Sequence, residues 1–329
     1  MGNERICLYY RVEPERDRWA PGDRFIRPIV RRLVRGKRRL GGVDKVFFNL
    51  CLGLDRLGIR YETNIPFKRL RADDRVAVLG RGRHSLQGYD RTNPIVAGIG
   101  LMGHPGEWPT LCTDYPVVRY LQHSDWANDV YKPYFGKRCG IWPVGINTHA
   151  WTPSAVPKDL DFLFYDKVQW NRERNQRELI QPIKDVLRRR RMKFAEIRYG
   201  GYDESDFRGL LSRSKAMIFL SESESQGLAY QECMSSGVPV LAWDQGWWLD
   251  PSRFKWGNAD VRATSVPYFD DNCGSTFRNL DEFETSLDRF LDRLHLQEFD
   301  PRAYILKNLT LEHCSQRFVD ILRRDLGTS

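Results

Sequence analysis

Residues 216–246 read AMIFLSESESQGLAYQECMSSGVPVLAWDQG, and this stretch decides the fold. It opens with five apolar residues, 216–220, a run short enough and bounded closely enough by polar residues to predict a buried strand. Residues 221–227 are small, polar or acidic and end in glycine, which is typical of a loop. Residues 228–243 predict a helix that ends at Gly237 and then a second strand. This order of elements places a helix N-terminus, with its free N–H groups, at the carboxyl edge of a parallel sheet.

Two carboxylates in this unit lie eight positions apart, Glu224 in the loop and Glu232 in the helix. With Gly227-Leu228 between them and SSGVPV at residues 235–240, they resemble the EGFGLxxxEAMACGxPVVA signature of retaining GT-B glycosyltransferases of family 4. The resemblance implies that Glu232 binds the ribose hydroxyls of a nucleotide, that Glu224 contacts the donor sugar, and that loop N–H groups hold sugar and diphosphate. The donor-binding candidates beside Glu232 are Gln226, Gly227 and Leu228. An ordinary βαβ unit with surface glutamates is the alternative.

The composition describes a folded protein with more than one core. At 329 residues the chain suits two domains of about 150 residues each, and 41% hydrophobic residues are enough for packed interiors. No apolar run approaches the ~20 residues that span a bilayer, and the N-terminus lacks the pattern of a secretion signal. The seven dispersed cysteines form no CxxC pair and are typical of buried thiols in a reducing compartment. We therefore expect a cytoplasmic protein, whose net charge of +9 favours an anionic partner.

Apolar runs alternate with helical patterns along the chain, as a doubly wound α/β domain requires. The predicted strands cover residues 6–10, 75–79, 94–99, 160–165, 194–199, 216–220, 238–243 and 266–269. The predicted helices cover residues 43–58, 175–191, 202–215, 280–295 and about 310–326.

The segment IWPVGINT at residues 141–148 resembles the IPNGVDT segment that ends the first domain in the same family. The resemblance implies the GT-B fold, in which two Rossmann-like domains face each other across a central cleft. Residues 1–150 would then form the acceptor-binding domain and residues 151–329 the nucleotide-sugar-binding domain. The last helix, about residues 310–326, would cross back to the first domain.

Charged residues follow the predicted strand at 160–165. Retaining family members carry an Arg here and, a few residues later, a Lys, and both hold the donor diphosphate; Lys167 and Arg172 match them, with Arg174 as the alternative to Arg172. Cations aimed at a developing negative charge stabilise it strongly. Because no Asp-x-Asp pair stands in a strand-end loop, we predict that the site needs no metal. A charged surface turn would also explain these residues.

Two further candidates lie in the first half of the chain. The pair Gly41-Gly42 precedes a predicted helix and resembles the GG-loop of the family, so Gly42 is a donor-binding candidate, although a bare turn would explain it as well. His104 lies in a loop that follows a predicted strand, where open α/β sheets place ligand groups. Since family members use a histidine of the first domain near the donor sugar, His104 is the catalytic candidate and His123 the alternative.

Residues 24–40, RFIRPIVRRLVRGKRRL, predict a basic amphipathic helix. Such a helix binds anionic membrane surfaces, and it is equally typical of a helix packed on its domain with a solvated cationic face. Nucleic-acid binding lacks the interleaved aromatic residues that would favour it.

Taken together, these residues predict a retaining glycosyltransferase of hexosyltransferase type that moves a sugar from a nucleotide-diphosphate sugar to an acceptor hydroxyl, without a cofactor. The acceptor would be a glycan, a lipid-linked compound or a small molecule, and the protein would be cytoplasmic or peripheral at a membrane. The alternatives are a nucleotide-sugar epimerase and a degenerate GT-B protein that only binds membrane or nucleic acid through its basic helix.

Overall fold

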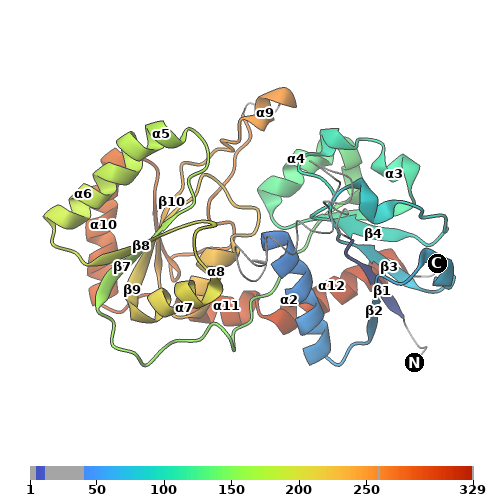
Figure 1. Cartoon of the computed structure of the whole chain (residues 1–329), viewed down its shortest axis with the longest axis horizontal. Coiled ribbons are helices and arrows are strands. Elements are labelled where there is room, and N and C mark those ends of the chain that lie inside the picture. The colour runs from blue at the N-terminus through green and yellow to red at the C-terminus, as the bar shows by residue number, and fades with distance from the viewer. Residues whose placement is uncertain (1–4, 12–40, 258–259, 328–329) are drawn as a thin grey trace, which may run out of the picture.

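The computed structural model describes residues 5–11, 41–257 and 260–327, and it consists of two α/β domains, each built on a parallel sheet (Figure 1). The predicted basic helix at residues 24–40 lies outside the described residues. No helix in the described ranges is long and apolar enough to cross a membrane.

The first domain contains a six-stranded sheet in the order β2-β1-β3-β4-β5-β6, with every neighbouring pair parallel. Its strands are β1 (Ile6–Tyr9), β2 (Tyr61–Thr63), β3 (Arg75–Val78), β4 (Ile95–Gly98), β5 (Val117–Gln122) and β6 (Cys139–Ile141). Strands β1 and β4 are buried at every position, because helices and loops cover both faces of the sheet. This is why their sequences read as continuous apolar runs and were predictable, whereas the exposed three-residue strand β2 carries no such pattern.

Helices of the first domain lie between these strands. They are α2 (Gly42–Arg56), α3 (Leu111–Asp114) and α4 (Asp125–Phe135), with 3₁₀ turns η1 (Phe67–Arg69), η2 (Arg83–Leu86), η3 (Pro105–Glu107) and η4 (Gly136–Arg138). Helix α2 confirms the helix predicted over residues 43–58, and it buries Val46, Phe47, Leu50 and Leu54.

The second domain contains a five-stranded parallel sheet in the order β11-β10-β9-β7-β8. Its strands are β7 (Leu160–Asp166), β8 (Phe194–Arg198), β9 (Ser214–Leu220), β10 (Val240–Trp243) and β11 (Gly274–Phe277). The central strand β9 and strand β10 confirm the two strands predicted within residues 216–246. The strand predicted at residues 266–269 is wrong, since this segment is irregular and contains Pro267, which has no N–H to donate to a sheet. One edge strand is β11, whose sequence GSTF has too few apolar residues to be recognised; the other is β8.

Helices cover both faces of this second sheet (Figure 1). They are α5 (Arg172–Asn175), the π-helical η5 (Gln176–Ile180), α6 (Gln181–Arg189), α7 (Glu204–Arg213), α8 (Leu228–Ser235), α10 (Leu280–His295) and α11 (Pro301–Asn308). Two more helices follow β7 without covering this sheet: α9 (Ser252–Lys255) lies at the junction of the domains, and α12 (Leu311–Asp325) packs on the first domain. Helix α10 has the predicted bounds, because Asn279 caps its N-terminus by accepting from the N–H of Glu282.

The chain passes between the domains at two neighbouring points. Ile146 on the outward passage forms a parallel backbone bridge with Thr310 on the return passage. Beyond Thr310, helix α12 packs against α2 of the first domain, and its Phe318 and Leu322 join the apolar cluster beneath that helix (Figure 1). The indole of Trp142 donates to the carbonyl oxygen of Cys314 (2.8 Å) and ties the two passages together.

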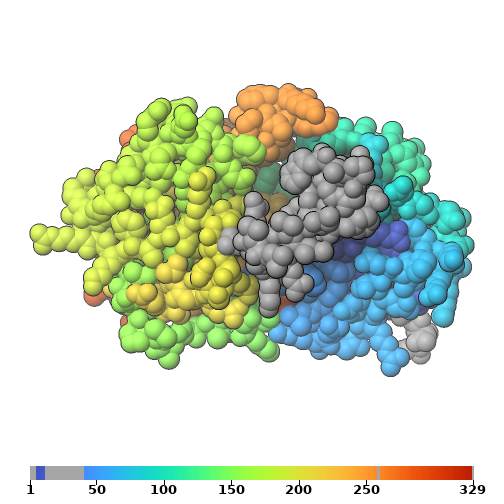
Figure 2. Space-filling view, viewed as in Figure 1, coloured from blue at the N-terminus to red at the C-terminus, as the bar shows by residue number. Residues whose placement is uncertain are grey.

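A segment of the second domain, residues 247–257, also reaches the first domain; we call it the strap. Its helix α9 lies at the junction of the domains (orange in Figures 1 and 2). Trp248 joins the hydrophobic cluster of the first domain, and the ring of Trp256 stacks on His104 with ring centroids 4.7 Å apart. The strap therefore connects the two domains on the side where the parallel strands of both sheets have their carboxyl ends.

Candidate functional site

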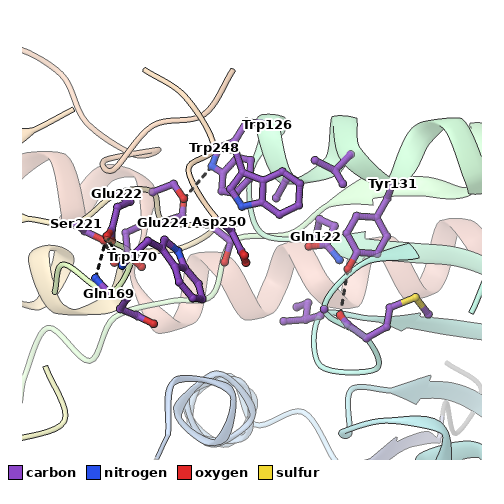
Figure 3. A pocket seen from close by; sticks show the side chains of 17 residues that line it. Gln122, Trp126, Tyr131, Gln169, Trp170, Ser221, Glu222, Glu224, Trp248 and Asp250 are labelled. Atoms are coloured by element: carbon purple, nitrogen blue, oxygen red, sulfur yellow. Dashed lines mark hydrogen bonds between the residues drawn. The ribbon is translucent and has the colours of Figure 1, made fainter. Parts of the chain in front are cut away.

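A cavity of about 340 Å³ lies between the domains at the carboxyl edges of both sheets (Figure 3). The first domain contributes residues that follow β4 and β5, and the second contributes residues that follow β7 and β9 together with the strap. The lining residues are Ile99, Met102, Gly103, Gln122, Trp126, Ala127, Val130, Tyr131, Gln169, Trp170, Ser221, Glu222, Ser223, Glu224, Ser225, Trp248 and Asp250. This is the place where open α/β sheets bind ligands.

The predicted Glu224 and Lys167 meet in the second-domain wall of this cavity. The Nζ of Lys167 lies 2.6 Å from Oε1 of Glu224, and the hydroxyl of Ser221 donates to the same oxygen (2.8 Å). The main-chain oxygen of Glu224 accepts from the indole N–H of Trp126 in the first domain (2.9 Å, Figure 3). The main chain and the carboxylate of Glu224 are thus both held by hydrogen bonds, and the carboxylate is largely buried next to the ammonium of Lys167.

Helix α8 begins directly after this loop, and Gly227 is its N-terminal cap. The φ of Gly227 is +80°, and a Cβ at this position would lie 2.0 Å from the ring of Tyr230, so only glycine fits. No side chain of the described residues caps the helix, and the N–H groups of a first turn, here from Leu228 onward, have no partner within the helix and suit an anion.

Gln226 has a structural role that the sequence did not indicate. Its buried amide accepts from the N–H of Val144 (3.0 Å), donates to the carbonyl oxygen of the same residue and donates to Gln231. Ser225-Gln226 stand where the family signature has Gly-Phe, and here the longer polar side chain ties the start of α8 to the outward passage between the domains. A donor contact by Gln226 remains a prediction.

Glu232 lies in the next turn of α8 and forms an interdomain ion pair that sequence reasoning missed. Its Oε1 is 2.5 Å from Nζ of Lys45 in α2, and Lys45 also contacts Glu204 of α7 (3.1 Å). Burial raises the pKa of Glu232 to about 7, although the ammonium of Lys45 opposes this shift. Lys45 is the third residue after the predicted Gly42, so the only signal in the sequence was its place in the first turn after the glycine pair.

Arg172 is held by a buried partner. Its guanidinium binds both oxygens of Asp166 (2.6 and 2.5 Å), and Asp166 is fully buried at the end of β7. Arg174 is largely exposed and pairs with Glu178 one helical turn on. Of the three cations predicted here, the structure brings Lys167 to the lining residue Glu224, and none of the three lines the cavity itself.

The two candidate histidines are both buried. His104 is 2% exposed, stacks on Trp256 of the strap, and its Nδ1 accepts from the N–H of Gly106 (3.0 Å). His123 directly follows the lining residue Gln122, and its ring is bonded to the carbonyl oxygen of Trp142 (3.1 Å). Burial lowers the pKa of His123 to about 4, so this ring is neutral at physiological pH. Neither histidine lines the cavity, and a catalytic role for His104 remains a prediction.

Glu222 is a second residue of the site that the sequence analysis overlooked. The residue is 4% exposed, and its carboxylate accepts from the N–H groups of Gln169 and Trp170 (2.9 and 2.8 Å). Burial raises its pKa above the usual value. The alternating SESES pattern could have indicated it, because Glu222 and Glu224 fall on the same side of an extended loop. Glu222 fixes the loop after β7 against the loop after β9.

No group of three or more His, Cys, Asp or Glu side chains within the described ranges is arranged to hold a metal ion. Among the described residues beside Glu224, Lys167 supplies a positive charge and the N-terminus of α8 supplies the positive end of a helix dipole.

Several solved structures of glycosyltransferases resemble this chain throughout. AviGT4, a glycosyltransferase involved in avilamycin A biosynthesis, matches with a TM-score of 0.57 at 16% identity over 99% of both chains. A glycosyltransferase from Rickettsia africae matches with a TM-score of 0.56 at 12% identity over the whole of both chains. The lipopolysaccharide outer core galactosyltransferase WaaB matches with a TM-score of 0.54 at 10% identity over 98% of this chain and 99% of its own. No protein-family model and no curated protein matches the sequence. The two parallel sheets and these likenesses together show that the chain has the two-domain, Rossmann-like GT-B fold of these glycosyltransferases.

Proposed function

We propose that the protein transfers a sugar from a nucleotide-diphosphate sugar to an acceptor hydroxyl, with retention at the anomeric carbon. One observation carries this proposal. Glu224 lines a cavity between two domains, the ammonium of Lys167 is bound to its carboxylate, and helix α8 begins four positions further on with no described side chain capping it. A positive side chain and a helix N-terminus side by side suit a diphosphate, and the carboxylate beside them suits sugar hydroxyls.

In the reaction, the bond between the anomeric carbon and the diphosphate oxygen breaks, and a bond to the acceptor oxygen forms. The acceptor proton leaves with the diphosphate. Negative charge develops on the diphosphate as the bond breaks, and Lys167 with the N–H groups of α8 would stabilise that charge without a metal ion. Glu224 would orient the hexose, and Glu232 would accept from the ribose hydroxyls in place of its bond to Lys45.

The first test is thermal stability with UDP-, GDP-, ADP- and TDP-sugars, each with and without Mg²⁺. A donor at about 100 times its dissociation constant adds about 2.7 kcal/mol to the free energy of unfolding. We expect stabilisation by one nucleotide type, and its loss in Glu232→Gln.

The second test is hydrolysis of that donor. We expect Lys167→Met to slow hydrolysis about 100-fold, as is typical when a group that stabilises charge in the transition state is removed. Lys167→Arg, which keeps the charge, should retain more activity than Lys167→Met. Lys215→Met is the matched control, because Lys215 pairs with Asp161 near the opposite edge of the sheet. If no donor stabilises the protein or is hydrolysed, while anionic vesicles or RNA bind in a salt-dependent manner, the transferase function is excluded.

A further inference from the structure

A second cavity, of about 260 Å³, lies in the first domain where helix α12 meets strands β5 and β6. The strands contribute Arg119 and Gly140 to its lining, and α12 contributes Arg317, Asp320 and Arg324. Since β6 is the last strand of its sheet, no further strand covers this side. No described residue lines both this cavity and the one between the domains, so the two are separate sites.

The charged groups of this lining are mostly positive. Three guanidinium groups share the cavity with one carboxylate, that of Asp320, which accepts from the side-chain amide of Gln316 (2.8 Å). Arginines on a helix surface are often only solvated, so the contacts of each guanidinium decide whether they form a binding site.

Arg119 is held in place by the protein itself. Its aliphatic stem lies against Gly140, where a Cβ would come within 2.8 Å of Cδ. Its Nη1 donates to the carbonyl oxygens of Lys137 (2.9 Å) and Cys139 (3.1 Å), and its Nε donates to Asp325 (2.6 Å). The guanidinium is therefore ordered before any ligand arrives, which lowers the entropy cost of binding one.

Asp325 holds a second guanidinium beside the first. Its two carboxylate oxygens accept from Nε and Nη2 of Arg324 (2.9 and 3.2 Å), and its side chain is 9% exposed. One carboxylate is thus shared by Arg119 and Arg324. Among the bonds to described residues, Nη1 of Arg324 takes no part, so it remains for a ligand.

Arg317 supplies a guanidinium that no described carboxylate neutralises. It lies two turns before Arg324 on the same face of α12. Its side chain is exposed and makes no hydrogen bond or ion pair with a described residue. When Asp320 and Asp325 are both counted, three arginines stand against two aspartates, and the surroundings of the cavity keep a positive charge.

These contacts suit a phosphate group better than a carboxylate. The carboxylate of Asp325 already takes the paired N–H groups of Arg119 and Arg324, whereas a phosphate has further oxygens and a second charge with which to bind Arg317 as well. The volume lies below the about 300–1,000 Å³ of pockets for larger organic ligands, which favours a small phosphate over a nucleotide.

We propose that this cavity binds a phosphate group, either inorganic phosphate or the phosphate monoester of a small molecule. Arg317 and Arg324 of α12 and Arg119 of β5 are its donors. Such a ligand fastens α12 to the sheet close to the point where Trp142 donates to the carbonyl oxygen of Cys314, and so strengthens the attachment of the returning helix to the first domain. The site does not depend on sugar transfer and goes beyond the proposed function.

The test is the Tm of the protein in inorganic phosphate and in glycerol 3-phosphate, compared with chloride at the same ionic strength, together with the ³¹P NMR line width of each phosphate. We expect the Tm to rise to a plateau with phosphate and the ³¹P line to broaden, because a ligand that binds only the folded protein stabilises it. An equal rise in chloride would show an effect of ionic strength alone and overturn the inference.

The variant Arg317→Gln separates binding from folding. Because Arg317 is exposed and has no described partner, the variant should keep the wild-type Tm in phosphate-free buffer. It should weaken phosphate binding about 10-fold, the equivalent of one charge-assisted hydrogen bond, and Arg317→Lys should weaken it less. Arg188→Gln, which removes an exposed pair with Asp185, is the matched control and should not change phosphate binding. Wild-type phosphate affinity in Arg317→Gln would overturn the inference.

Lys167→Met distinguishes this site from the one proposed for the donor diphosphate. Phosphate binding that is lost in Lys167→Met and kept in Arg317→Gln would place the ion between the domains, and the inference would be wrong while the proposed function gained support. Vesicles with phosphatidic acid present the same monoester on a lipid. If they bind through Arg317 and the free phosphates do not, the phosphate group comes from a lipid headgroup; if neither binds, the inference is wrong and the transferase function is unaffected.

Discussion

The Nζ of Lys45 lies 2.5 Å from Oε1 of Glu232, which joins the first turn of α2 in one domain to α8 in the other. The side chain of Glu232 is 6% exposed, and that of Lys45 is 22% exposed. A pair so poorly hydrated depends on both partners, because removing one leaves the other charge buried. The carboxylate that we propose for the ribose is therefore also a contact that holds the cleft together.

Lys45→Met should destabilise the protein more at pH 8 than at pH 5. The folded-state pKa of Glu232 is about 7, so its carboxyl is protonated at pH 5. A neutral carboxyl does not need a cationic partner, and removing Lys45 therefore lowers the free energy of unfolding only slightly at this pH. At pH 8 the variant leaves a buried carboxylate without its cation, which should lower the free energy of unfolding by about 2 kcal/mol. Urea unfolding at both pH values measures the difference. Lys132→Met, which removes an exposed pair with Asp129, is the control and should show no pH-dependent change. Equal effects of Lys45→Met at both pH values would contradict the prediction.

Glu232→Gln should flatten the pH dependence of stability. A carboxyl whose pKa is higher in the folded than in the unfolded protein stabilises the fold at low pH, and this contribution is lost as pH rises through the folded-state pKa. Between pH 4.5 and about 7 the loss in the wild type is on the order of 3 kcal/mol from this group. The Glu232→Gln variant has no titrating carboxyl at this position and therefore lacks this pH-dependent change in stability. We would measure the Tm of both proteins from pH 5 to pH 8, and parallel curves would show that Glu232 does not titrate in this range.

Arg172→Gln and Arg174→Gln should differ sharply in stability. The first leaves the fully buried Asp166 without its cation and should cost about 3 kcal/mol. The second removes an exposed pair with Glu178 and should leave the urea midpoint unchanged. If Arg172→Gln instead keeps wild-type stability and loses donor hydrolysis, the guanidinium serves the diphosphate rather than the fold.

Gly53→Ala tests how closely α2 and α12 approach. A Cβ on Gly53 would lie 2.0 Å from Oγ of Ser315 and 2.7 Å from the carbonyl oxygen of Leu311, so the two helices would have to separate. We expect a loss of about 2 kcal/mol, despite the better helix propensity of alanine. Gly209→Ala in α7 is the control, because a Cβ there meets nothing within 4 Å and should stabilise the helix by up to about 1 kcal/mol. The prediction fails if both variants gain stability in chemical unfolding.

Secondary structure could be predicted from the sequence where the residues that determine it lie close together in the chain. The stretch from β9 to β10 could be predicted because apolar runs, loop residues and the glycine before α8 each act over a few positions. Lys167 and Glu224 were each singled out by the family resemblance, but their contact was not predicted. They meet because β7 and β9 are adjacent parallel strands, whose carboxyl ends share one edge of the sheet.

Features that depend on distant contacts could not be predicted. Lys45 and Glu232 are 187 positions apart, and nothing near either residue indicates the other. The loop around His104 was predicted as a loop, but its burial depends on Trp256 from the strap.

The bridge between Ile146 and Thr310 restricts how the cleft can open. A domain attached by a single linker can rotate about it in any direction. Two passages that are bonded to each other act as a hinge and restrict the rotation of one domain relative to the other. Opening then has to draw the strap away from His104 and Lys45 away from Glu232.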